Sequence, residues 1–229
     1  LPSFFFFRPD MDYLPSIQIE PENSADATVI WLHGLGASGY DLEPIVPELA
    51  LPVRAAVRFV FPHAPSIPIT INGGYIMPGW YDIREIDVNR KIDEEQLLAS
   101  AHAVHALVDR EIESGIDSRR IIIAGFSQGG AVGYQAALTY PRPLAGLLAM
   151  SSYFATAESM EPDPANRALA IAIYHGTADL MVPESLGRQS CLQLLEMGYS
   201  PIYKSYPMDH AICAEEIADI SQWLQNALL

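Results

Sequence analysis

The stretch IIIAGFSQGG, residues 121–130, decides the fold of this chain. Its apolar half predicts a β-strand over Ile121–Gly125, and a helix is predicted over Gln128–Thr139, where Pro141 stops it. The Gly-x-Ser-x-Gly pattern is typical of a sharp strand-to-helix turn that raises the Ser127 hydroxyl above the edge of a sheet. Glycines flank the serine because a Cβ at either position would collide in so tight a turn. We therefore predict an exposed Ser127 beside helix N–H groups that can stabilise a developing oxyanion.

Short apolar runs alternate with helical patterns along the rest of the chain. Several runs are apolar at consecutive positions, as expected for strands that are buried on both faces of a parallel sheet. The predicted strands are Ile17–Ile19, Thr28–Leu32, Arg58–Phe61, Ile121–Gly125, Gly146–Ser151, Ile171–His175 and Ile202–Tyr206. The predicted helices are a long one that begins after Asp93, capped with the help of Gln96, and ends at Gly115, then Gln128–Thr139, Glu184–Met197 and Ala214–Leu228. This order predicts an α/β fold with a mostly parallel central sheet flanked by helices.

The chain shows no internal repeat and no linker, so we assign residues 11–229 to a single domain. The segment Pro62–Asp82 breaks the alternation, because it holds four prolines and three glycines. We expect it to form a long irregular loop with a functional role. Residues 1–10, LPSFFFFRPD, lack the pattern of a signal peptide. We interpret them as upstream or artificially added sequence before a natural start at Met11.

The charge of the chain argues against two classes of partner. Its 229 residues include 28 acidic and 13 basic side chains, for a formal charge of −15. Such a charge repels phosphate backbones and anionic headgroups, so we expect no nucleic-acid partner and no stable membrane association. Cys191 and Cys213 are too few for a disulfide framework and indicate a reducing compartment, which we take to be the cytoplasm. His102 and His105 could share a metal ion, but no third ligand is near them in sequence, and we expect no metal site.

A serine hydroxyl becomes a nucleophile when a base takes its proton and an acid orients that base. Two histidines follow Ser127, namely His175 at the end of a predicted strand and His210 after the last strand. In proteins with this kind of serine turn, the catalytic serine comes first along the chain, the acid follows it, and the histidine comes last. The acid must therefore lie between Ser127 and the histidine in sequence. Asp179 meets this condition, whereas Asp209 adjoins His210 and would have to bend back to its own neighbour. We predict that Ser127 is the nucleophile, Asp179 the acid and His210 the base.

Two backbone N–H groups are needed to hold the oxyanion. The residue after the serine, Gln128, supplies one of them. The other is expected from the turn after an early strand, in WLHGLG at residues 31–36, where Leu35 is in position to donate. We expect His33 to brace this turn rather than to act as a second base.

Seven short motifs in a fixed order make the sequence recognisable. They are HGLG at 33–36, FPHAP at 61–65, NGG at 72–74, MPGWYD at 77–82, GFSQGG at 125–130, HGTAD at 175–179 and MDHAIC at 208–213. The set resembles the phospholipase/carboxylesterase family, which includes bacterial carboxylesterases and acyl-protein thioesterases. The resemblance extends from Ile17 to Leu229. It implies an α/β-hydrolase fold with no separate cap domain, often dimeric, that hydrolyses carboxylic esters or thioesters without a cofactor.

Carried over by motif, the family's nucleophile, acid and base fall on Ser127, Asp179 and His210. Its oxyanion donors fall on Leu35 and Gln128. The resemblance also implies an acyl pocket formed by Trp80, Met181 and Val182. We add Ile76 to the pocket wall, because the apolar segment around it is next to the Trp80 motif.

We expect a serine carboxylesterase that hydrolyses short- to medium-chain esters through an acyl-enzyme on Ser127, with a small-molecule ester as its substrate. The same residues would also serve an acyl-protein or acyl-CoA thioesterase, or a lysophospholipase, which the negative charge disfavours. A non-catalytic binding protein is a weaker alternative, because such a protein gains nothing from a strained, exposed serine. Apolar groups around Ile67–Ile76 are candidates for the contact of a homodimer.

Overall fold

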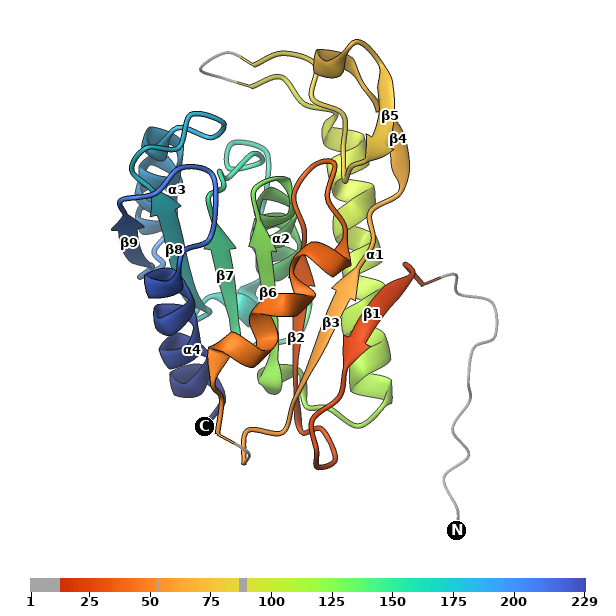
Figure 1. Ribbon diagram of the computed structural model, residues 1–229, viewed down its shortest axis with the longest axis vertical. Coiled ribbons are helices and arrows are strands. Elements are labelled where there is room, and N and C mark those ends of the chain that lie inside the picture. Colours follow the sequence, from red (N-terminus) through yellow and green to blue (C-terminus); the bar gives the residue numbers. More distant parts are fainter. Residues whose placement is uncertain (1–12, 53, 87–89) are drawn as a thin grey trace.

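A computed structural model describes residues 13–52, 54–86 and 90–229. The predicted extension over residues 1–10 and the start at Met11 lie outside the described residues. Seven strands form the central sheet in the order β1-β3-β2-β6-β7-β8-β9 (Figure 1). The strands are β1 Ser16–Ile19, β2 Ala27–Leu32, β3 Val57–Pro62, β6 Ile121–Phe126, β7 Gly146–Met150, β8 Ala170–Gly176 and β9 Ile202–Tyr206. Every neighbouring pair in this sheet is parallel except β1 and β3, which are antiparallel, and each predicted strand is present to within one residue at either end.

Four α-helices and two 3-10 helices cover the two faces of the sheet. Helices α1, α2 and α3 contribute to the core on one face, and α4, η1 and η2 lie on the other (Figure 1). The bounds are α1 Glu94–Glu113, α2 Gln128–Thr139, α3 Glu184–Glu196, α4 Ala214–Leu228, η1 Gly39–Asp41 and η2 Glu43–Leu49. As predicted, the Asp93 side chain caps α1 by accepting a hydrogen bond from the Gln96 N–H. The reciprocal bond of a capping box is not formed, because the Gln96 side chain accepts from the Asp82 N–H and the Asp93 N–H donates to the Asp82 carbonyl. The expected α/β architecture is therefore confirmed.

The strands are apolar at consecutive positions because both of their faces are covered. Along β6, Ile121 and Ile123 pack into the core beneath α1 and α2, whereas Ile122 and Ala124 pack into the core beneath α4. Successive side chains of a strand point to opposite faces of the sheet, so a strand between two helical layers needs an apolar residue at every position.

The segment predicted to be irregular contains a second, small sheet. Strands β4 Ser66–Ile69 and β5 Tyr75–Pro78 form an antiparallel hairpin, with the 3-10 turn η3 Thr70–Asn72 between them. Proline is tolerated because each strand of a two-stranded hairpin has one edge where no N–H has to pair. The turn closes through Gly73 and Gly74, whose φ angles are +67° and +78°. The hairpin lies above the carboxyl ends of the parallel strands (Figure 1).

Two further one-turn helices, η4 Ser118–Arg120 and η5 Pro164–Asn166, join the larger elements. Within the part of the chain that the structure describes, no helix has both the length and the apolar character needed to cross a bilayer.

Candidate active site

Ser127 occupies a strained turn between β6 and α2. Its φ and ψ angles are +55° and −121°, a backbone conformation that side-chain-bearing residues rarely adopt. The glycines around it are required as predicted: a Cβ on Gly125 would lie 2.3 Å from the Gly129 carbonyl oxygen. The strained residue is held by its neighbours, because the Ser127 N–H donates to Met150 O at 2.8 Å and the Ser152 hydroxyl donates to Ser127 O at 2.6 Å.

Three side chains from three loops meet at this turn. The Nε2 atom of His210, from the loop after β9, lies 2.9 Å from Ser127 Oγ. Its Nδ1 atom lies 2.6 Å from Oδ2 of Asp179, from the loop after β8. Because a carboxylate only accepts, the imidazole carries its proton on Nδ1 and presents the Nε2 lone pair to the serine hydroxyl. Asp209, the rival acid, is exposed, and Asp179 is the partner of His210.

Asp179 is fixed as an ionised carboxylate. Its second oxygen, Oδ1, accepts hydrogen bonds from the N–H groups of Met181 at 2.9 Å and Val182 at 2.8 Å. Burial by itself would raise the pKa of Asp179, but the hydrogen bonds from His210 and from the Val182 N–H outweigh it and lower that pKa below its ordinary value. Asp179 is therefore charged at neutral pH and oriented toward His210.

The turn that carries Leu35 lies directly against the serine. A Cβ placed on Gly34 would be 3.3 Å from Ser127 Cβ, and Gln128 begins α2 on the other side. His33 braces the turn, because its Nε2 accepts from the Ala64 N–H at 3.0 Å and its Nδ1 donates to Gly34 O at 2.7 Å. Burial lowers the pKa of His33, in keeping with a neutral ring.

The side chain of Gln128 has a structural role that the sequence analysis missed. Its Oε1 accepts from the Trp80 N–H at 2.8 Å, and its Nε2 donates to the Tyr81 carbonyl at 2.7 Å. The residue is 2 % exposed, so these bonds satisfy a buried amide. One feature of the sequence could have indicated this role: Gln128 is a polar residue in a helix that otherwise begins with glycines and alanines. The Gln128 side chain therefore connects the segment after the hairpin to the serine turn.

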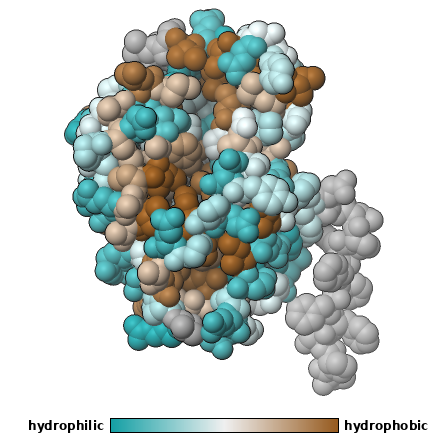
Figure 2. Space-filling view, viewed as in Figure 1, coloured by the Kyte–Doolittle hydropathy of each residue, from teal (hydrophilic) through white to brown (hydrophobic). Residues whose placement is uncertain are grey.

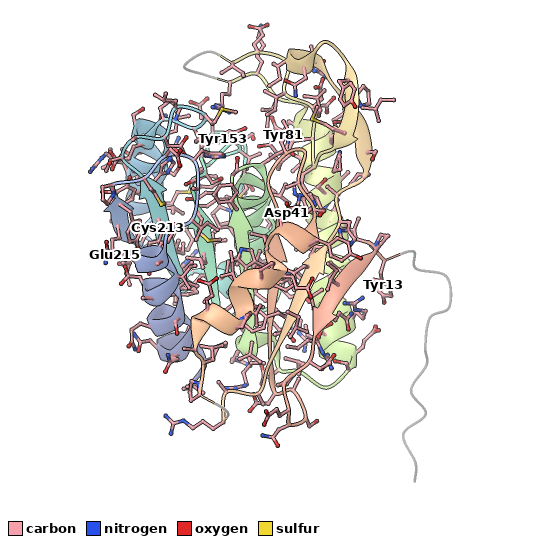
Figure 3. All side chains as sticks on the ribbon, viewed as in Figure 1. Tyr13, Asp41, Tyr81, Tyr153, Cys213 and Glu215 are labelled. Atoms are coloured by element: carbon pink, nitrogen blue, oxygen red, sulfur yellow. The ribbon has the colours of Figure 1, made fainter. Side chains whose placement is uncertain are left out.

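An apolar cleft of about 710 Å³ opens above Ser127. Its apolar lining residues include Leu35, Leu42, Ile45, Ile71, Met77, Ile83, Ile86, Phe126, Tyr153, Met181, Val182, Ile212 and Ile217. Figure 2 shows apolar residues gathered across the middle of one face of the molecule, bordered by hydrophilic ones. Figure 3 shows Tyr153 close to Tyr81, and their hydroxyls are 2.8 Å apart. The cleft therefore combines an apolar wall with the serine at its floor.

Two of the four predicted pocket residues line this cleft and two do not. Met181 and Val182 are part of the wall. Trp80 is 1 % exposed and supports the turn that carries Leu35, since its indole N–H donates to His33 O at 2.8 Å. Ile76 is 65 % exposed and points away, because the alternation of side chains along β5 gives the cleft-facing position to Met77.

Within the described ranges, no three His, Cys, Asp or Glu side chains are gathered as metal ligands. His105, one of the two helix histidines, instead bonds through Nε2 to the Ala136 carbonyl at 2.8 Å.

Known proteins are similar to this chain over most of its length. A family model described as Phospholipase/Carboxylesterase matches residues 15–228. Acyl-protein thioesterase 1 of Neurospora crassa is 43% identical over 213 residues, which cover 88% of this chain and 87% of the relative. A probable carboxylesterase of Oryza sativa subsp. japonica is 35% identical over 205 residues, which cover 87% of this chain and 77% of that protein.

Solved structures share the fold. The crystal structure of Zea mays acyl-protein thioesterase 2 matches with a TM-score of 0.84 at 27% identity, covering 95% of this chain and 100% of that one. The sequence match spans nearly the whole chain and includes the serine turn and the loops that carry its partners. This chain therefore belongs to the phospholipase/carboxylesterase family, a family of serine hydrolases with the α/β-hydrolase fold.

Proposed function

We propose that the protein hydrolyses acyl thioesters, with acylated protein as its substrate class, through an acyl-enzyme on Ser127. The observation that carries the chemistry is the hydrogen-bonded series from Ser127 through His210 to Asp179 at the floor of an apolar cleft. The choice of thioester rests on the relatives, because the Neurospora crassa protein at 43% identity is named an acyl-protein thioesterase. The carboxylesterase expected first from the sequence has less support than this alternative.

In the proposed mechanism His210 is the base and then the acid. Its Nε2 takes the proton of Ser127 Oγ as that oxygen attacks the carbonyl carbon of the thioester. The charge that develops on the carbonyl oxygen is held by the N–H groups of Leu35 and Gln128. Collapse of the intermediate breaks the C–S bond, and His210 gives its proton to the departing thiolate. Asp179 stabilises the imidazolium that forms in between.

The second half of the reaction repeats the first with water. His210 removes a proton from the water as its oxygen attacks the acyl-enzyme. The acid product leaves, and the proton returns to Ser127 Oγ. No further reactant is consumed. The acyl group occupies the apolar cleft, where Met77, Met181 and Val182 contact it in this proposal.

The test is an activity profile with matched substrates. Oxygen esters and thioesters from acetyl to palmitoyl are compared by kcat/KM, and the Ser127→Ala variant provides the background. We expect long-chain thioesters to be preferred. A preference for short-chain oxygen esters would favour the carboxylesterase. Comparing a palmitoyl-cysteinyl peptide with palmitoyl-CoA then separates an acyl-protein thioesterase from an acyl-CoA thioesterase.

A further inference from the structure

His175 is a second histidine beside the acid, and the mechanism above does not use it. It lies near the end of β8 and is fully buried. Its Nε2 is 2.8 Å from the carbonyl oxygen of Val182 and 3.5 Å from Oδ2 of Asp179. The latter is the oxygen that His210 contacts. Asp179 Oδ2 is thus flanked by ring nitrogens of two histidines.

The proton of the His175 ring can be placed from its partners. A backbone carbonyl only accepts, so Nε2 carries the hydrogen that is donated to Val182. The other nitrogen, Nδ1, has no hydrogen-bond partner among the described residues. A charged ring would bury a second N–H without an acceptor, which is unfavourable. The ring is therefore neutral, and its single N–H is directed at the loop that carries Asp179.

The ring is also held from behind. Gly187 of α3 lies against it, so closely that a Cβ at this position would be 2.3 Å from His175 Nδ1. Because only glycine leaves room for the imidazole, α3 fixes the distance between the ring and the loop in front of it.

Val182 connects these contacts. Its carbonyl accepts from His175, and its N–H donates to Asp179 Oδ1. We propose that His175 is a positioning residue for Asp179: by holding Val182 and facing Oδ2, it sets the direction in which the carboxylate meets His210. This inference rests on the proposed roles of Ser127, His210 and Asp179.

Two substitutions at His175 test the proposal. His175→Leu removes the Nε2–H donor and replaces the ring with an apolar side chain, whereas His175→Gln keeps an N–H near the place of Nε2. We expect His175→Leu to lower kcat about 100-fold with little change in KM, because a small misplacement of a catalytic group has that effect. The glutamine variant should recover most of the loss. Equal damage by both variants, or a folded leucine variant with unchanged kcat, would overturn the proposal.

A spectroscopic measurement keeps the test independent of the substrate. The proton between His210 Nδ1 and Asp179 should give a far-downfield NMR signal in the wild type, because that hydrogen bond is short and charge-assisted. We expect the signal to shift or vanish in His175→Leu and to return in His175→Gln. If the signal responds in this way while no thioester is hydrolysed, the proposed function fails and the positioning role stands. A signal that is the same in all three proteins would reject the positioning role.

Two further variants serve as control and backup. His105→Leu removes another histidine that bonds to a backbone carbonyl, but on α1, and should leave kcat unchanged. Should His175→Leu fail to fold, Gly187→Ala pushes the ring from behind without removing it. We expect a loss of kcat and a shifted downfield signal in that variant as well, and a wild-type signal and kcat would count against the proposal.

Discussion

Gly129, in the first turn of α2, lies against Leu32 at the end of β2, so that a Cβ on Gly129 would be 2.5 Å from the Leu32 carbonyl oxygen. This contact brings the helix that starts after Ser127 next to the turn that carries Leu35. The two proposed oxyanion donors therefore come from backbone segments whose spacing depends on a missing side chain.

Gly129→Ala should accordingly destabilise the protein and reduce its activity. The added methyl group meets backbone atoms that cannot move aside, and overpacking of this kind costs about 3 kcal/mol or more. The matched control is Gly133→Ala, one turn along the same helix, where a Cβ would meet only Leu147 and Ile123 at 3.4 and 3.7 Å. We expect the control to be neutral or stabilised by up to ~1 kcal/mol. Denaturant unfolding of both variants measures the difference, and equal stabilities would contradict this account.

Ser127→Ala should lower kcat/KM by at least ~1000-fold, because the acyl-enzyme can no longer form. Labelling by a fluorophosphonate should be lost at the same time. The fold should be retained, since alanine has the same backbone restrictions as serine. Hydrolysis near the wild-type rate would mean that Ser127 is not the nucleophile.

Asp179→Asn should reduce kcat on the order of 10⁴-fold, because the amide no longer stabilises the imidazolium and favours the wrong tautomer of His210. Asp209→Asn is the matched control, since Asp209 adjoins His210 in sequence but is exposed. Steady-state kinetics of the two variants should separate them clearly. A large loss of kcat in Asp209→Asn alone would reverse the assignment of the acid.

Stability should depend on pH through Glu216. This side chain is fully buried on α4, neither of its oxygens has a hydrogen-bond partner among the described residues, and burial raises its pKa to about 8. A carboxyl with a raised pKa binds its proton more tightly in the folded state. The folded protein is therefore favoured below the ordinary pKa near 4.5, and that advantage is lost as the pH rises toward 8.

Glu216→Gln should remove this dependence, because the amide does not ionise. Between pH 4.5 and 8 the wild type should lose stability relative to the variant, by an amount on the order of 4 kcal/mol. Urea unfolding across this pH range measures the difference. Glu215→Gln, at the exposed neighbouring position, is the control and should follow the wild type. Parallel pH curves for wild type and Glu216→Gln would disprove the role of Glu216.

The sheet and the site loops could be predicted because their signals are local. The strand of residues 121–126 and the helix after Ser127 follow from periodicity and from glycines that a tight turn requires. Asp179 and His210 follow from the chain order of a known arrangement, and the structure brings both to Ser127.

The cleft wall was predicted less well, because its residues depend on which face of a short strand points inward. Ile76 and Met77 are adjacent and both apolar, and composition alone does not say which of them faces the cleft. The hairpin was not predicted because its segment contains prolines, which normally argue against strands. Trp80 lay in the right motif, but its burial against His33 is a tertiary contact that no local pattern reveals.

The hairpin β4–β5 has a consequence for how proteins of this design can diversify. The groups assigned to bond breaking are on loops after β6, β8 and β9, whereas the two hairpin strands pair with each other and the hairpin contributes Ile71 and Met77 to the cleft. The hairpin also contacts the turn that carries Leu35, because the Pro78 carbonyl accepts a hydrogen bond from the Gly36 N–H at 2.7 Å. The Gln128 side chain ties the segment after it to the serine turn. A hairpin grafted from a relative that keeps all three of these hydrogen bonds should therefore change part of the cleft wall and leave the arrangement of Ser127, His210 and Asp179 in place.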